Sequence, residues 1–216
     1  MDQNIKKHWE EYYSQTSLNL EGNVNVFSEF FTQNNQYFRE AILDLGCGDG
    51  KILKILRDGG LLDIYGLDCS SSAIRISEQT LLEEKIQNNL IEGDMEQINY
   101  SFPNKKFNTL ISNMSLQQGT FEYAGKLLNS WNGSLNIGGA VYILTRSRLI
   151  LPNEYVELDS DTIFIPKLGI TRVHFSAESL KSILPNNWRL KEFRELTYPG
   201  RRSQVSAFQV LAVKIS

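Results

Sequence analysis

The stretch AILDLGCGDGK, residues 41–51, decides the fold of this chain. Its first five residues form a short apolar run, which is typical of a buried parallel strand. Gly46, Gly48 and Gly50 follow, and glycine lets a chain turn sharply while its backbone comes close to a ligand. The next stretch, KILKILRDGG, has apolar residues at helical spacing and ends in two glycines. The sequence therefore predicts a strand, a tight turn and a helix.

The same alternation of strand and helix continues along the chain. We predict strands at 41–45, 64–68, 89–94, 107–113 and 138–146, and helices at 51–60, 70–85 and 119–135. Such alternation favours a parallel sheet that is covered on both faces. The last two predicted strands, 188–196 and 203–215, flank a Pro-Gly turn and are therefore antiparallel. The predicted fold is α/β, a Rossmann-like, doubly wound, seven-stranded sheet that is mostly parallel and closes with an antiparallel C-terminal hairpin.

We expect a single domain, because 216 residues suit one core and no repeat or Pro-rich linker divides them. Residues 1–40 are predicted to form a helical, aromatic lid, 41–145 a ligand-binding core, and 146–216 a second site segment with the closing hairpin. Within this last part, the sequence is polar and irregular up to Val173, and a helix is expected over 174–184.

Composition excludes several classes of protein. The net charge of −3 comes without any long block of Lys and Arg, which argues against a protein built to grip nucleic acid or an anionic membrane. No apolar run is long enough to span a bilayer, and the first residues lack the apolar core of a secretion signal. The expected location is the cytoplasm. Cys47 and Cys69 do not suggest a disulfide framework, and their spacing suits no metal site.

Acidic residues accompany the glycine turn. Asp68 lies twenty residues after Gly48 at the end of the next predicted strand, where a carboxylate can bind ribose hydroxyls, and Asp94 ends the third strand. The glycines are spaced G-x-G-x-G, one residue short of the pyrophosphate pattern, and Asp44 and Asp49 lie inside the turn. Carboxylates repel a pyrophosphate and attract an amine or a sulfonium. The ligand is therefore expected to be a cationic adenosyl compound, which disfavours a nicotinamide-dependent oxidoreductase.

In order and spacing, five segments resemble the motifs of class I S-adenosylmethionine-dependent methyltransferases of the small-molecule type. They are ILDLGCGDGKIL, IYGLDCSSSAI, IEGDMEQI, FNTLISNMSLQ and LNIGGAVYIL, within residues 41–145. The resemblance implies S-adenosyl-L-methionine as cofactor, with Gly46 and Gly48 against its methionine part and Asp68 at its ribose. It further implies Asp94 and Met95 at the adenine and Asn113 beside the sulfonium. The remaining candidate cofactor residues are Asp44, Cys47, Cys69 and Tyr13.

The fourth motif bears on the acceptor. Its residues Asn113-Met114-Ser115-Leu116 lack the two prolines and the aromatic residue that accompany methylation of nucleobase amino groups in relatives. A nucleobase acceptor is thereby disfavoured. The expected reaction is in-line transfer of a methyl group to a small molecule. Two alternatives stay open at this point: a protein or peptide methyltransferase, and a non-catalytic subunit that binds the cofactor.

Catalytic candidates are few because the sulfonium is already activated. Arg146 follows the fifth predicted strand and can bind a carboxylate or phosphate of the acceptor, as can Arg172. His174 is a candidate base for an acceptor that must lose a proton. We therefore expect a small, acidic methyl acceptor as partner, with no metal, nucleic acid or membrane. The sequence does not indicate an oligomeric state.

Overall fold

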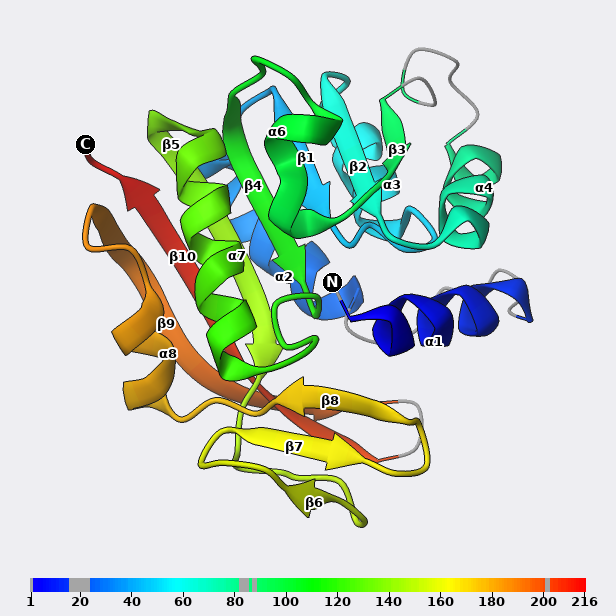
Figure 1. Ribbon diagram of the computed structural model, residues 1–216. Helices are drawn as coiled ribbons and strands as arrows, with labels where there is room; N and C mark the ends of the chain where they lie inside the picture. Colours follow the sequence, from blue (N-terminus) through cyan, green and yellow to red (C-terminus); the bar gives the residue numbers. More distant parts are fainter. Residues whose placement is uncertain (1, 16–23, 82–85, 87–88, 201–202) are drawn as a thin grey trace.

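The computed structural model describes residues 2–15, 24–81, 86, 89–200 and 203–216, and its centre is a seven-stranded sheet (Figure 1). The strands lie in the order β3-β2-β1-β4-β5-β10-β9. They are β1 Ile42–Leu45, β2 Ile64–Asp68, β3 Leu90–Glu92, β4 Phe107–Asn113, β5 Leu135–Arg146, β9 Trp188–Pro199 and β10 Gln204–Lys214. The first five pair in parallel, whereas β10 is antiparallel to both β5 and β9. The predicted Rossmann-like fold with its closing hairpin is confirmed.

Helices cover both faces of this sheet. On one face lie α2 (Val24–Asn34), α3 (Lys51–Asp58) and α4 (Ser71–Thr80), and on the other α6 (Ile98–Ser101), α7 (Phe121–Ser134) and α8 (Ala177–Ile183). Successive residues of a strand point to opposite faces, so Ile42 packs with the first group while Leu43 packs with the second, beside Trp131. The predicted helix over 70–85 ends at Thr80, and its last four residues lie outside the described part of the chain.

Residues 149–173 contain regular structure that the sequence analysis did not anticipate. They form a second, antiparallel sheet of β6 (Val156–Glu157), β7 (Thr162–Ile165) and β8 (Ile170–Val173). The prediction of an irregular segment is therefore wrong. Both longer strands are only four residues long, but they are rich in β-branched side chains and pair across the turn 166–169. The short helix α6 and the 3-10 turn η2 (Met95–Gln97) were also missed.

Only the first part of the predicted N-terminal lid lies over the strand ends. Helix α1 (Gln3–Ser14) lies beside β8 and α4, at the carboxyl ends of the parallel strands (Figure 1). Helix α2 instead belongs to the core, where Phe27 and Phe30 are fully buried and contact the ring of Tyr142. The aromatic residues of 1–40 thus divide between a cover and a core.

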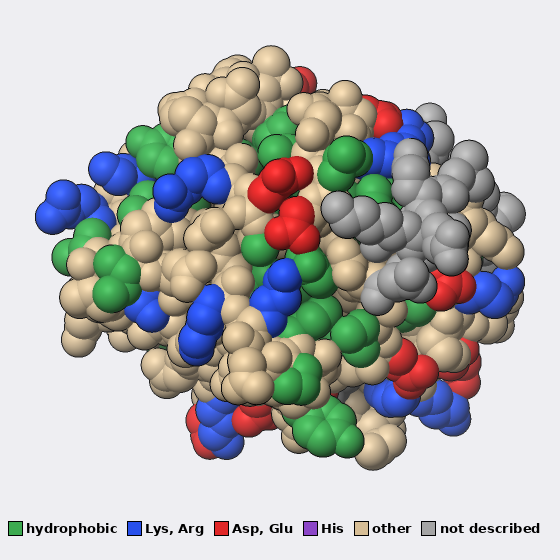
Figure 2. Space-filling view, turned by 90° about the horizontal axis from the view of Figure 1, so that it is seen from above, with side chains coloured by type: hydrophobic (Ala, Val, Ile, Leu, Met, Phe, Trp, Pro, Cys, Tyr) green, Lys and Arg blue, Asp and Glu red, His purple; other side chains and the backbone are tan. Residues whose placement is uncertain are grey.

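Figure 2 views the opposite end of the molecule, from which the parallel strands start. Acidic and basic side chains are interspersed on this face. No helix within the described residues has both the length and the apolar character needed to cross a membrane.

Candidate active site

The glycine turn after β1 has the conformation that only glycine adopts readily. Gly46, Gly48 and Gly50 have φ angles of 76°, 56° and 78°, in the left-handed region. The backbone N–H of Gly46 donates to the carbonyl of Leu67 at 2.7 Å, which ties the start of the turn to β2. Gly50 directly precedes α3, so the turn links the end of the strand to the first residue of the helix.

Asp68 holds this turn in place. One carboxylate oxygen accepts the backbone N–H of Gly48 at 2.9 Å, and the other accepts that of Ser70 at 3.0 Å. The carboxyl is buried, and burial raises its pKa, while the two backbone donors act in the opposite direction. The Asp68 carboxyl also lines the cavity, where a ligand can donate hydrogen bonds to it. The residue predicted to bind ribose therefore also positions the backbone of the turn.

A cavity of about 350 Å³ lies between the glycine turn and α1. Its walls also come from the carboxyl ends of β2, β4 and β5, with contributions from β8 and β9. The cavity is lined by nine of the ten predicted cofactor residues, which are Tyr13, Asp44, Gly46, Cys47, Gly48, Asp68, Cys69, Met95 and Asn113. Of the two predicted catalytic residues, Arg146 lines the cavity and His174 does not.

Asp94 is the predicted cofactor residue that does not line the cavity. Its carboxylate accepts the backbone N–H of Glu96 and the hydroxyl of Tyr123, both at 2.9 Å, and so caps η2. Its neighbour Met95 is buried, and the Met95 sulfur lies against the glycine turn. The predicted contact of Asp94 with adenine stays a prediction.

His174 lies behind the cavity wall, with only 2% of its surface exposed. Its Nδ1 faces the carbonyl oxygen of Ser147 at 3.3 Å. Burial and the nearby Arg146 guanidinium lower the pKa of this imidazole to about 4, so His174 is neutral at neutral pH. Among the described residues, His174, the predicted base, is therefore not one of those that contact the cavity.

Unpartnered oxygen atoms mark one half of the cavity. Both carboxylate oxygens of Asp44 are buried without a hydrogen-bond partner among the described residues, as is the side-chain oxygen of Asn113. Burial, followed by the charge of Asp68, raises the pKa of Asp44 well above its usual range. Buried polar atoms normally have partners, so these oxygens fit a ligand that brings cationic or hydrogen-bond-donating groups. An adenosyl compound with an amine and a sulfonium has such groups.

Two thiols also line this half of the cavity. Cys47 and Cys69 are free, and burial raises the pKa of both, that of Cys69 to about 12. A protonated, buried thiol acts as a small apolar group. Within the described ranges, no group of three or more His, Cys, Asp or Glu side chains is arranged to hold a metal ion.

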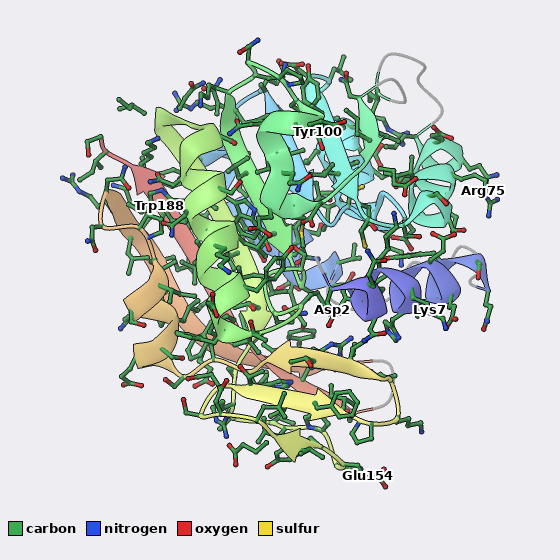
Figure 3. The ribbon with its side chains drawn as sticks, viewed as in Figure 1. Asp2, Lys7, Arg75, Tyr100, Glu154 and Trp188 are labelled. Atoms are coloured by element: carbon green, nitrogen blue, oxygen red, sulfur yellow. The ribbon has the colours of Figure 1, made fainter. Side chains whose placement is uncertain are left out.

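Helix α1 covers the cavity with aromatic side chains. Trp9, Tyr12 and Tyr13 all line it, and their rings contact one another. The Tyr13 hydroxyl lies so close to Gly48 that a Cβ at that position would be only 2.3 Å from it. Figure 3 shows Lys7 of α1, and Asp2 just before this helix, between Tyr100 of α6 at the top of the view and Glu154 at the bottom.

Glu10 fastens α1 to the start of α4. Its carboxylate accepts the hydroxyls of Ser70 and Ser72 at 2.7 and 2.6 Å, and more distantly the backbone N–H of Ser72. A carboxylate is stabilised at a helix N-terminus, where N–H groups point outward. The hydrogen bonds from Ser72 and Ser70 lower the pKa of Glu10 to about 2.

Glu10→Gln should therefore loosen α1. We expect hydrogen exchange of the α1 amides to become about tenfold faster, because a charged acceptor is lost while the serine hydroxyls remain. In the wild type, the depressed pKa means that the contact is present above pH 4.5 and weakens as the pH falls from there towards 2. Glu11→Gln is the matched control, since Glu11 lies on the same helix, is exposed and pairs with Lys7 at 3.8 Å rather than with α4. Equal exchange in the two variants would contradict this role of Glu10.

The other half of the cavity wall contains residues that the sequence analysis did not assign. Gln117 is fixed by hydrogen bonds to the Met114 carbonyl and from the Thr145 hydroxyl. Tyr198 enters from β9, and burial raises its pKa to about 12. Gln117 is the last residue of the fourth motif, but the resemblance assigned it no role, and Tyr198 lies on a strand outside the five motif segments. Arg146 and Arg172, which the sequence did single out, lie in this half.

Comparison with known proteins agrees with this geometry. The profile of the methyltransferase domain family matches residues 42–139, which hold the glycine turn and strands β1 to β4. This part of the chain is a class I S-adenosylmethionine-dependent methyltransferase domain. The resemblance read from the sequence is confirmed, and the cofactor of the domain is S-adenosyl-L-methionine.

Curated relatives of the methyltransferase domain act on different acceptors. Ribosomal RNA small subunit methyltransferase C of Yersinia pseudotuberculosis is 27% identical over 157 residues, which are 67% of this chain and 44% of the relative. The human eEF1A lysine and N-terminal methyltransferase is 23% identical over 141 residues, 61% of this chain and 20% of the relative. The chain thus spans less than half the length of these two relatives.

Solved structures share the methyltransferase fold over nearly the whole chain. A SAM-dependent methyltransferase from Anabaena variabilis has a TM-score of 0.72 at 19% identity, covering 99% of this chain and 96% of that one. Magnesium protoporphyrin IX methyltransferase from Synechocystis, solved with bound SAM, has a TM-score of 0.67 at 15% identity and covers 99% and 98% of the two chains. At these identities the likeness shows the fold alone.

Proposed function

We propose that this chain transfers the methyl group of S-adenosyl-L-methionine to a small-molecule acceptor by in-line displacement. One observation carries the proposal. A single cavity runs beneath α1 from the glycine turn to Arg146 and Arg172, so cofactor residues and a cationic wall share one space. A small acceptor fits such a space, and an acidic one suits its arginines. The cytoplasmic location stays a prediction from the sequence.

The oxygen-rich half of the cavity fits the cofactor. Gly46 and Gly48 let a ligand approach the backbone, Asp68 offers oxygens to ribose hydroxyls, and Asp44 and Asn113 offer unpartnered oxygens to cationic groups. When bound, S-adenosyl-L-methionine supplies a methyl group on a sulfonium that is already activated. The task left to the protein is to align the acceptor and to keep water out, which contributes about 7–11 kcal/mol in favourable cases.

The arginine half fits the acceptor. We assign Arg146 to binding and orienting it, because its guanidinium lines the cavity. An acceptor whose reacting atom is already ionised needs no base, whereas a hydroxyl or a protonated amine does. We propose that His174 supports the position of Arg146 from behind rather than acting as this base. A neutral, buried imidazole outside the cavity is suited to that role.

Other acceptors are less well supported. The ribosomal RNA relatives suggest RNA as an acceptor. However, Asn113-Met114-Ser115-Leu116 lacks the prolines and the aromatic residue that accompany methylation of nucleobase amino groups. A protein acceptor, suggested by the human relative, has to reach a cavity that α1 covers. A non-catalytic subunit has no need of the unpaired arginines beside the cofactor residues.

Labelled cofactor tests this proposal. The purified chain is incubated with methyl-labelled S-adenosyl-L-methionine and separately with small metabolites, ribosomal RNA and proteins from a cell extract. We expect label in the small-molecule fraction with the wild type, and none with Asp68→Ala, which removes the anchor of the glycine turn. Label confined to the RNA or the protein fraction would overturn the small-molecule proposal. No transfer to any fraction, despite tight cofactor binding, would favour the non-catalytic subunit.

A further inference from the structure

Arg146 and Arg172 are partly buried arginines to which the described residues supply no counter-ion. Arg146 ends β5 and Arg172 lies on β8, and the backbone N–H of Phe175 donates to the Arg146 carbonyl at 3.0 Å, which holds the two strand ends together. The Nε atom of each guanidinium is buried without a hydrogen-bond partner, and no carboxylate of the described residues forms an ion pair with either.

Some arginines elsewhere in the chain do have carboxylate partners. Arg148 pairs with Glu157 at 2.7 Å, and Arg194 pairs with Glu192 at 2.9 Å. Arg148 is a near neighbour of Arg146 along the chain, so a carboxylate is available to an arginine only two residues away, whereas the described residues offer none to Arg146. Leaving a buried charge unpaired is costly, and proteins retain such charges where a ligand supplies the opposite charge.

The groups around Arg146 and Arg172 leave this pair of arginines with a charge of +2. Burial lowers the pKa of Arg146, and burial together with the Arg146 charge lowers that of Arg172 to about 10, so both stay protonated at neutral pH. Beside them, His174 is neutral, with its pKa lowered to about 4, and Tyr198 is neutral, with its pKa raised to about 12. The Trp9 ring of α1 lies 6.0 Å from the Arg172 guanidinium and adds no formal charge.

We infer that Arg146 and Arg172 together form a subsite for a dianionic group of the acceptor, either a phosphate monoester or a pair of carboxylates. The inference rests on the proposed function and names its substrate class. Guanidinium groups bind carboxylate and phosphate oxygens through two parallel hydrogen bonds, and their unpartnered Nε atoms are available for this. Two fixed positive charges favour a ligand with two negative charges over a ligand with one. The subsite therefore selects acceptors by charge before it selects them by shape.

Titration calorimetry with simple anions tests the subsite directly. The wild type, saturated with S-adenosylhomocysteine, is titrated at constant ionic strength with acetate, malonate and inorganic phosphate. We expect malonate or phosphate to bind about tenfold more tightly than acetate, and the tighter of the two identifies the kind of dianion. Arg172→Gln and Arg146→Gln should each weaken dianion binding about tenfold or more, and Arg172→Lys less. Arg189→Gln, which removes an exposed charge on β9, is the control.

Three results would overturn the subsite. They are acetate binding as tightly as both dianions, no saturable binding of either dianion to the wild type, and unchanged dianion binding in the folded glutamine variants. If one glutamine variant does not fold, the other and Arg172→Lys still decide. Repeating the anion titrations without S-adenosylhomocysteine separates failure of this subsite from failure of the proposed function. If the chain does not bind S-adenosylhomocysteine, the methyltransferase function is contradicted, while the anion titrations still report on the two arginines.

Discussion

Asp68→Ala should remove most of the affinity for S-adenosyl-L-methionine. The Asp68 carboxylate accepts the backbone N–H groups of Gly48 and Ser70, and the residue lines the cavity. Alanine leaves both buried donors unpaired, each at a cost of about 1–3 kcal/mol, and removes the expected ribose contact. We therefore expect cofactor affinity to fall about a hundredfold or more, measured by titration calorimetry, with a lower temperature of thermal unfolding.

The matched control for this variant is Asp63→Ala. Asp63 directly precedes β2, the strand that ends at Asp68, and so lies at the end of β2 away from the cavity. Its carboxylate accepts the hydroxyl of Tyr65 at 2.7 Å. We expect Asp63→Ala to leave cofactor affinity unchanged. If a folded Asp68→Ala protein binds the cofactor within about twofold of the wild type, Asp68 has no part in the site.

Gly48→Ala should have the second largest effect. Its φ of 56° strains any residue with a Cβ by about 1–2 kcal/mol, and the added Cβ would lie 2.3 Å from the Tyr13 hydroxyl. Tyr13 is the end of a side chain and can move, so the fold should survive while the cover of the cavity is displaced. We expect cofactor affinity to drop about tenfold or more, read from the same calorimetric titration.

Gly169→Ala separates backbone strain from the clash. Gly169 has a φ of 66°, but a Cβ there would meet no atom within 4 Å. Both variants should lose similar stability, and only Gly48→Ala should lose cofactor affinity. Equal cofactor affinity in the two variants would mean that Gly48 serves the turn alone. Gly46 is less suitable for this test, because a Cβ there would lie 2.7 Å from the Cβ of Ser115 and disturb the packing of β4 with β1.

The central part of this fold could be predicted because its signals are local. The run before Gly46 and the alternating stretches on either side of the Pro-Gly turn each determine their own strand. The sheet of β6 to β8 was missed because its strands are short, so that polar turn residues dominate the composition of 149–173. Local pattern carries little information about such a segment.

The candidate site divides in the same way. Gly48 follows β1 and Asp68 ends β2, and the fold brings them together because parallel strands end at one edge. Asp94 also ends its segment at that edge, but its carboxylate turns to η2 and Tyr123. His174 is adjacent to the strand that carries Arg172, yet it lies outside the cavity lining. Which side chain enters the cavity depends on tertiary contacts that spacing does not encode.

A crystal structure of the chain with S-adenosylhomocysteine and malonate tests the central claim most directly. The claim is that one cavity holds the cofactor at the glycine turn and an anionic acceptor group at the arginines. We predict that the ribose hydroxyls contact Asp68, that the thioether lies near Asn113, and that malonate lies between Arg146 and Arg172. Contact of the cofactor product with the two arginines instead, or malonate bound only outside the cavity, would contradict these positions.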